Sequence, residues 1–197
     1  MTERGRSADP RAERVHTRLR EAAFAMAHEH PVDRITVGDL VGRAKVSRQV
    51  FYRHFRDRDD AVASAFSRAF TDATGGATGG DARTRILDLF EFAGAHPAMC
   101  RNIVPSTVNQ HVLATYRDAL FEPCQQIAEQ GMAVLDTVAP LPAEAVTRFL
   151  VGGFMEVLRS WMEDPHATDL HARVSAALDT VDALLGTSPA QKGPTHG

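Results

Sequence analysis

The sequence lacks the long apolar segments that mark membrane and secreted proteins. No apolar run approaches the roughly 18 residues needed to cross a bilayer. The first twenty residues lack the apolar middle region of a signal peptide. There are only two cysteines, Cys100 and Cys124, and without a secretion signal such a pair is typical of reduced core thiols rather than a disulfide. We therefore predict a cytoplasmic protein.

Motifs of enzymes and metal sites are also missing. We find no nucleophile elbow, phosphate-binding loop or metal motif. Four histidines have neither an i, i+4 partner nor a nearby Cys-x-x-Cys pair, namely His96, His111, His166 and His171. We predict no catalytic residue, no metal and no cofactor. One alternative is an enzyme that uses a cysteine with a histidine, and Cys100 beside Arg101 is also a candidate redox sensor.

Charge, in contrast, is plentiful and unevenly distributed. Hydrophobic residues make up 44% of the chain and charged residues 24%, which is typical of a globular protein with a real core. Residues 1–58 carry 13 Lys and Arg against 8 Asp and Glu, a net charge of +5, and the remainder carries −8, which together give −3. A basic first third on an acidic remainder indicates that one end meets a polyanion.

Helical periodicity dominates the chain, and no segment reads as a strand, so we predict an all-α fold. The first helix covers about residues 10–28, a second begins after Thr36, a third runs from Ser47 to about His54, and Asp57 caps a fourth. Later helices are predicted near 81–95, 97–104, 107–137, 143–163 and 167–186. The two Gly-Gly pairs of 74–80 are too costly for a helix interior, so this segment is predicted as a loop or hinge.

These elements predict two domains joined by a hinge. Residues 1–58 form a helix-turn-helix DNA-binding domain, with a disordered arm at about 1–9. Residues 59–80 provide a connecting helix and the Gly-rich hinge. Residues 81–186 form a C-terminal helical domain, and the tail 187–197 has a disordered composition.

The second and third predicted helices have the arrangement of a helix-turn-helix. Thr36 and Asp39 are spaced as a capping box, and the turn is "GRAKV" at 42–46. Phe51 and Phe55 lie four residues apart and can share the core face. The remaining residues of the third helix then surround its outer faces: Arg48, Gln49, Val50, Tyr52, Arg53 and His54.

The outward residue types suit DNA. Arginine forks onto guanine, glutamine pairs with adenine, and the methyl groups of Val50 can meet a thymine methyl. Tyr52 and His54 can donate to phosphates, and Thr36 sits at a helix N-terminus that suits a phosphate. Arg58 at the start of the fourth helix is a further phosphate candidate. An alternative of another class is a helical dimer that binds nucleic acid without sequence preference.

The segment "ITVGDLVGRAKVSRQVFYRHFRDRDDAV" resembles the DNA-binding region of TetR-type transcriptional regulators. The matching residues are Thr36, Val37, Asp39, Leu40, Ala44, Val46, Ser47, Phe51, Tyr52, His54, Phe55 and Arg58. Arg58 stands where lysine is usual, and Val50 where a small or hydroxylated residue is common. The resemblance implies a ligand-responsive repressor that binds a palindromic operator as a homodimer. A transcriptional activator and a regulator without a ligand remain alternatives.

The resemblance also implies that the C-terminal helices bind an unknown small-molecule effector and form the dimer. We predict an apolar effector pocket lined by middle helices: Phe90, Met99, Val104, Val108, His111, Leu113, Tyr116 and Phe121. We predict that the apolar stripes of the last two helices form the dimer interface: Phe149, Phe154, Val157, Leu158, Trp161, Val174, Leu178 and Val181.

Overall fold

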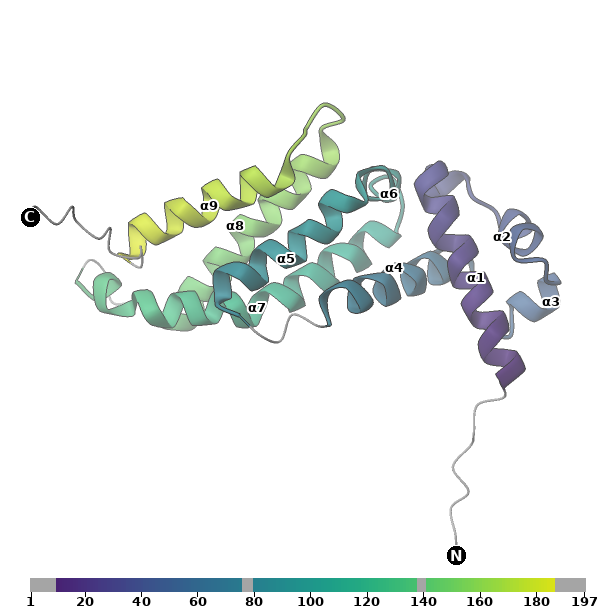
Figure 1. Ribbon diagram of the computed structural model, residues 1–197, viewed down its shortest axis with the longest axis horizontal. Coiled ribbons are helices and arrows are strands. Elements are labelled where there is room, and N and C mark those ends of the chain that lie inside the picture. Colours follow the sequence, from purple (N-terminus) through teal and green to yellow (C-terminus); the bar gives the residue numbers. More distant parts are fainter. Residues whose placement is uncertain (1–9, 76–79, 138–140, 187–197) are drawn as a thin grey trace, which may run out of the picture. The chain divides into compact units, whose positions relative to one another are not determined.

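A computed structural model describes residues 10–75, 80–137 and 141–186 (Figure 1). Within these ranges every regular element is a helix, which confirms the predicted all-α fold. The chain divides into two compact units, which we call unit 1 and unit 2. Unit 1 contains residues 1–75 and 96–115, and unit 2 contains residues 76–95 and 116–197.

Unit 1 begins with a long helix, which is followed by the short helices expected for a helix-turn-helix. Its helices are α1 (Pro10–Glu29), the 3-10 turn η1 (Val32–Arg34), α2 (Val37–Ala44), α3 (Arg48–Phe51), α4 (Arg58–Thr74) and α6 (Pro97–Ile103). The first residues of α7 (Val108–Leu135) complete it. Helix α1 packs against α2, α4 and α6, so it forms the centre of this unit.

The apolar stripe of α1 explains that central position. Its buried residues recur at helical spacing: Leu19, Ala22, Ala23, Met26 and Ala27. Four of these five are small or unbranched, so neighbouring helices can approach closely. The helix ends where His30 donates to the carbonyl of Met26 and Pro31 follows, because the residue before proline avoids the helical region.

Unit 2 is a bundle of longer helices. It contains α5 (Ala82–Ala95), the remainder of α7, α8 (Ala143–Glu163) and α9 (Leu170–Leu185). Helix α9 packs against α5 and α8. Arg83 of α5 joins α5 to α9, because its guanidinium lies 2.6 Å from Asp179 Oδ1 and 2.9 Å from Asp182 Oδ2.

The predicted helix spans agree with the structure to within a few residues, with one clear exception. Helix α3 ends at Phe51, three residues before the predicted end at His54. Residues 96–115 cluster with the N-terminal residues, not with the predicted 81–186 domain. The centre of the predicted hinge (76–79), the N-terminal arm and the C-terminal tail lie outside the described residues. None of the described helices has the length and apolar content required to cross a bilayer.

The structure corrects the predicted dimer interface. Five of its eight side chains are buried within the protomer: Phe154, Leu158, Trp161, Val174 and Leu178. A side chain that its own subunit already covers has no surface left for a second subunit, so the apolar stripes of α8 and α9 are core faces. Of the predicted set, Phe149 alone is strongly exposed, at 77%.

Candidate DNA-binding site

A complete capping box fixes the N-terminus of α2. The Thr36 hydroxyl accepts from the Asp39 amide at 3.2 Å and donates to Asp39 Oδ2 at 2.6 Å. The Thr36 amide donates to the same carboxylate oxygen at 2.9 Å. These bonds lower the pKa of Asp39, because they stabilise its charged form. Both donors of Thr36 are therefore occupied, and a carboxylate stands where a phosphate was predicted to bind.

The turn between α2 and α3 depends on one left-handed residue. Lys45 has φ 53° and ψ 49°, and its amide donates to the carbonyl of Gly42. The next amide, of Val46, donates to the carbonyl of Val41 at 3.0 Å. This pattern ends α2 and reverses the chain, as in other αL helix termini. It also leaves the Lys45 side chain exposed at the tip of the turn, a cation that the predicted site did not include.

Helix α3 is a single turn that continues as tighter winding. The Ser47 hydroxyl caps it by accepting from the Val50 amide at 3.3 Å. Beyond Phe51, the amides of Arg53 and His54 donate to carbonyls three residues back. Such three-residue bonds are typical of helix ends. The Phe55 amide again donates to a carbonyl four residues back, that of Phe51, at 3.0 Å, so residues 52–55 continue the turn with bonds of both kinds.

The inner face of this segment is buried in the core, as predicted. Phe51 and Phe55 are buried, and their ring centroids lie 5.7 Å apart. His16 of α1 stacks on Phe55 at 4.9 Å and on His54 at 5.5 Å. Partial burial lowers the pKa of His16, and Arg20 and His54 lower it further. This stack attaches the chain just beyond α3 to α1.

The outer face presents the predicted base-reading residues to solvent. Arg48, Gln49 and Arg53 are exposed, Tyr52 is 58% exposed, and Val50 is half-buried. His54 is also half-buried, because it stacks on His16. A Cβ added to Gly38 of α2 would lie 3.2 Å from Arg48 Nη2, so this glycine leaves room for the guanidinium. The site therefore combines a fixed inner face with a free, basic outer face.

Arg58 has a different environment from the one its predicted phosphate role requires. Its Nη1 donates to the carbonyls of Asp33 at 2.9 Å and Ile35 at 3.0 Å, and its Nε donates to Asp59 Oδ1 at 2.6 Å. The side chain is 26% exposed. Arg58 thus connects the first turn of α4 to the segment that precedes α2. Its Nε and Nη1 donors are therefore both used in hydrogen bonds within the domain.

The residues predicted for the effector pocket are divided between the two units. Phe90, Tyr116 and Phe121 belong to unit 2, where the Phe90 and Tyr116 rings are buried with centroids 5.8 Å apart. The others belong to unit 1: Met99, Val104, Val108, His111 and Leu113. His111 is exposed and its Nε2 lies 2.7 Å from Ser67 Oγ. Phe121 is 42% exposed, so it does not line an interior cavity.

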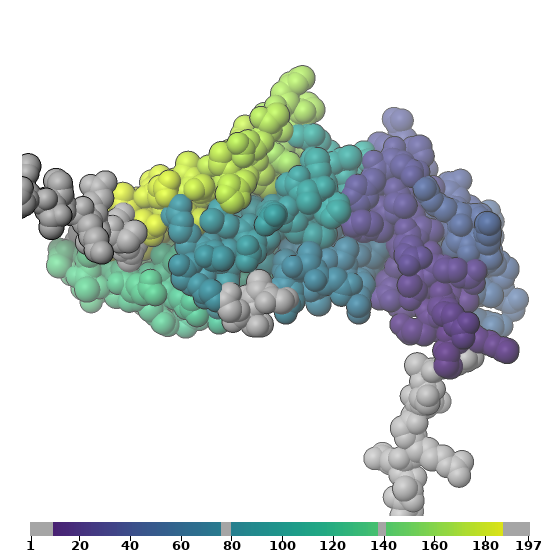
Figure 2. All heavy atoms as spheres, in the orientation of Figure 1, coloured from purple at the N-terminus to yellow at the C-terminus, as the bar shows by residue number. Residues whose placement is uncertain are grey.

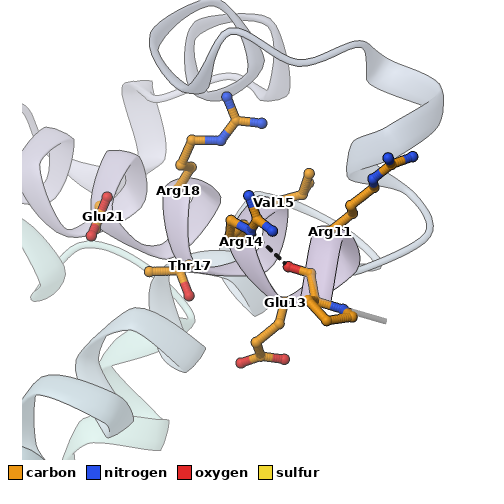
Figure 3. A pocket seen from close by; sticks show the side chains of 8 residues that line it. Arg11, Glu13, Arg14, Val15, Thr17, Arg18 and Glu21 are labelled. Atoms are coloured by element: carbon orange, nitrogen blue, oxygen red, sulfur yellow. Dashed lines mark hydrogen bonds between the residues drawn. The ribbon is translucent and has the colours of Figure 1, made fainter. Parts of the chain in front are cut away.

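Two surface hollows of unit 1 were not predicted. One, of about 480 Å³, lies between α4 and the start of α7 and contains Val108 and His111 of the predicted pocket. Its other lining residues include three acidic ones, Asp57, Asp59 and Asp60. The second lies along α1 and is lined by Pro10, Arg11, Glu13, Arg14, Val15, Thr17, Arg18 and Glu21 (Figure 3).

Both cysteines are buried, and burial raises the pKa of Cys100 and of Cys124 to about 12. A thiol with such a pKa is protonated at neutral pH and is a poor nucleophile. Among the described residues, no three His, Cys, Asp or Glu side chains gather as a metal site. The buried, protonated thiols therefore do not favour a redox-sensing or nucleophilic role for either cysteine.

Comparison with known proteins agrees with this geometry. Residues 19–65 match the family model for bacterial regulatory proteins of the tetR family. The match runs from the centre of α1 through α2 and α3 into α4. The helix-turn-helix segment of the chain therefore matches that of TetR-family DNA-binding transcriptional regulators, which confirms the resemblance noted in the sequence.

Solved structures share the fold of the chain at low sequence identity. A TetR-family transcriptional regulator from Streptomyces coelicolor has 18% identity and a TM-score of 0.61, over 88% of this chain and 83% of that one. The fatty acid degradation regulator FadR from Bacillus halodurans has 17% identity and a TM-score of 0.60, over 91% and 96%. The dihydroxyacetone kinase operon activator DhaS has 12% identity and a TM-score of 0.63, over 88% and 97%. No curated protein sequence matches the chain significantly.

Proposed function

We propose that the protein is a ligand-responsive repressor that binds a near-palindromic operator as a homodimer. The observation that carries this proposal is the two-sided character of the α3 segment. Phe51 and Phe55 hold it in the core, while Arg48, Gln49 and Arg53 stand exposed on the other side. A fixed helix with exposed arginine and glutamine matches the chemistry of the major groove. Because operator DNA lies in the bacterial cytoplasm, we propose that location for the protein.

Within this site, the roles follow from position and exposure. Arg48, Gln49 and Val50 begin α3, and the N-terminal residues of a recognition helix contact base edges. Tyr52 and Arg53 follow the helix and serve as phosphate contacts, which set register without reading sequence. Lys45 at the turn is an added phosphate contact. Thr36 and Arg58 act mainly on the domain itself, because their donors are occupied within it.

An unusual helix surface in unit 2 supports the homodimer. On α8, the exposed Phe149 is followed at helical spacing by Gly152 and Gly153, both exposed. A Cβ added to either glycine would meet nothing within 4 Å. Each glycine costs a helix about 1 kcal/mol relative to alanine, so an exposed pair is unfavourable in an isolated helix. A flat surface beside an aromatic side chain lets a second helix approach closely.

The neighbouring helix α9 carries a matching exposed surface. Ala172, Ala176 and Ala183 are exposed on one side, and Leu184 is 69% exposed. We propose that these faces of α8 and α9 pair with their copies in a second subunit. The two recognition helices would then enter successive major grooves about 34 Å apart.

The effector and the direction of regulation are proposed on the family resemblance. Unit 2 is the proposed ligand-binding part, with Phe90 and Tyr116 as its buried aromatic residues. An effector that favours a conformer with misplaced recognition helices needs a coupling of roughly 1–3 kcal/mol to release DNA. Because DhaS shares the fold and is named an activator, activation is the alternative.

The proposal is tested by selecting bound sites from a random DNA pool. Wild type, Gln49→Ala and the control Gln110→Ala are compared; Gln110 is an exposed glutamine on α7, outside the helix-turn-helix. We expect a two-fold symmetric motif for wild type and the control. Gln49→Ala should lose preference at one symmetry-related position, at a cost of about 1–3 kcal/mol for the favoured base.

The same selection separates the alternatives. A dimeric, folded wild type that enriches no motif would contradict specific operator binding and favour a non-specific nucleic-acid binder. A motif that is unchanged in Gln49→Ala would leave the regulator in place but remove Gln49 from base contact.

A further inference from the structure

Helix α1 carries a row of arginines that the helix-turn-helix does not use. Arg11, Arg14 and Arg18 recur at i, i+3 and i+7, so they share one face, and all three are exposed. Figure 3 shows Arg14 and Arg18 on one side of α1 and Glu13 on the other. The atoms of α1 form a broad outer surface of unit 1 (Figure 2). The row ends at Glu21, the next residue on this face.

Contacts within α1 do not neutralise the charges of Arg14 and Arg18. Arg14 Nε donates to the backbone carbonyl of Pro10 at 3.1 Å, an exposed bond within one helical turn. The ion pair between Arg20 and Glu13, with 3.8 Å between the charged atoms, lies on another face of the helix. A backbone carbonyl does not neutralise a guanidinium. Arg14 and Arg18 therefore contribute a concentrated positive charge to the surface, next to Arg11 one turn earlier.

Arg11 is also in an electrostatically unfavourable position. It lies in the first turn of α1, at the positive end of the helix dipole, where acidic side chains are favoured. Arginine at such positions adds to the positive potential instead of compensating it. Cations placed here are stabilised when an anion binds at the surface.

The row lies close to the DNA-reading segment of the same unit. His16 stacks on His54 and Phe55 just beyond α3, so this turn of α1 lies beside α3, while the arginines project from another face of the same part of the helix. Figure 1 shows the N-terminal half of α1 beside α3. DNA bound to the exposed face of α3 would therefore pass near this end of α1, and its backbone carries one negative charge for about every 1.7 Å of helix axis.

We propose that Arg11, Arg14 and Arg18 form a second DNA contact, which binds backbone phosphates outside the bases read by α3. The proposal rests on the proposed operator binding. Because phosphates carry no sequence information, this contact raises affinity for every sequence equally and leaves the recognised motif unchanged. It also extends the length of duplex needed for full affinity.

The test compares two charge-matched double variants on the selected operator. Arg14→Gln/Arg18→Gln removes two charges from the row. Arg68→Gln/Arg117→Gln removes two exposed arginines from α4 and α7, so the net charge of the protein changes equally. Dissociation constants are measured across a salt series on a duplex that ends at the motif and on one extended by about one helical turn on each side.

We expect the α1 variant to bind the extended duplex about tenfold or more weakly than wild type. Its salt slope should fall by about 0.9 for each phosphate that the protein no longer neutralises. The control should stay within twofold of wild type. Arg14→Lys/Arg18→Lys should retain most of the affinity, because lysine still binds phosphate as a point charge. This rescue separates a charge effect from damage to the helix.

Wild-type affinity and salt slope in the α1 glutamine variant would overturn the proposal. So would an equal loss in the α1 and control variants, since that result reflects net charge alone. Neither outcome contradicts the proposed function, because wild type would still select a symmetric motif. Failure of the proposed function is seen separately, as the absence of any motif for wild type.

Discussion

At the scale of single residues, Arg58 shows how a charged side chain can belong to the fold and not to the ligand. Its position at the start of α4 suggested a phosphate contact, because exposed arginines near a helix-turn-helix commonly bind DNA. Its guanidinium instead joins the carbonyls of Asp33 and Ile35 to the carboxylate of Asp59. Two of these three partners are backbone atoms more than twenty positions away, and no sequence pattern marks them.

We predict that Arg58→Ala lowers the free energy of unfolding by about 1.5–3 kcal/mol, the range for hydrogen bonds to charged groups. Arg58→Lys should recover part of the loss, because an ammonium reaches one carbonyl but lacks the planar fork. Urea denaturation measures both. The control is Arg56→Ala, whose side chain is 85% exposed and whose removal should change stability by less than about 0.5 kcal/mol.

A different result would restore the phosphate role of Arg58. If Arg58→Ala unfolds at the same urea concentration as wild type but binds operator more weakly and with a reduced salt slope, the side chain contacts phosphate in the complex. Thr36 presents the same contrast, since its hydroxyl and amide both bond to Asp39. A capping box can be recognised from the sequence, but only the structure shows whether its hydroxyl or amide donor is already bonded within the box.

At the scale of elements, the sequence predicted each described α-helix but not every end, and it did not predict the 3-10 turn η1. Long helices have apolar residues at steps of three and four over several turns, so their spans were predicted closely. Helix α3 has one turn, and the spacing of Phe51 and Phe55 suits both an α-helix to His54 and the observed one. The amides of Arg53 and His54 bond three residues back and that of Phe55 four residues back, a mixture that the spacing of apolar residues does not reveal.

The junction of α1 and α6 contains a contact that no motif indicated. His28 Nδ1 lies 2.8 Å from the carbonyl of Phe24, and His28 Nε2 lies 3.0 Å from His96 Nδ1. A carbonyl only accepts, so His28 carries a proton on Nδ1; when it is neutral, its Nε2 accepts from His96. Asn102 of α6 also donates to the carbonyl of Ala27 at 2.9 Å. These bonds connect the supporting helix of the DNA-binding region to α6.

This junction predicts a loss of stability in acid. Burial lowers the pKa of His96, and the nearby His28 lowers it further. Below the unfolded-state value of about 6.5, the unfolded chain therefore binds more protons than the folded chain, and stability falls as the pH falls. His16, whose pKa is also lowered, contributes in the same direction. Above this range, the contribution of both histidines is fully present.

The measurement is urea denaturation at pH 7.5 and pH 5.5 for wild type, His96→Gln and the control His166→Gln, which replaces an exposed histidine of unit 2. His96→Gln should lose less stability between the two pH values than wild type, although its stability at pH 7.5 is lower because the His28 bond is altered. The control should follow wild type. An acid loss in His96→Gln as large as that of wild type would show that this junction does not sense pH.

At the scale of the whole molecule, sequence reasoning could not separate a core face from an interface face. Helices α8 and α9 both carry apolar stripes, and a stripe that packs inside a subunit has the same spacing as one that packs against a partner. Phe154, Leu158 and Trp161 lie inside. The exposed face of α8 contains Phe149, Gly152 and Gly153 instead. The two glycines distinguish it, because they leave the helix surface beside Phe149 without side chains.

Phe149→Glu should convert the proposed dimer to a monomer, because it places a charge at the centre of an apolar contact that two copies share, where burial without a partner costs several kcal/mol. The folded protomer should keep its stability, since Phe149 makes little contact within its own subunit. Phe121→Glu is the matched control, an exposed aromatic on α7. Light scattering after size exclusion measures the mass of each variant.

Dimerisation and DNA binding should then change together. A monomer holds one recognition helix and loses the gain that two linked half-sites give, which is commonly about 10²–10⁴ in affinity. Its affinity for a full operator should therefore approach that of wild type for a half-site, whereas Phe121→Glu should bind as wild type does. A Phe149→Glu protein that remains dimeric would move the interface away from this face of α8. One that becomes monomeric yet binds the full operator unchanged would contradict the link between two-fold symmetry and recognition.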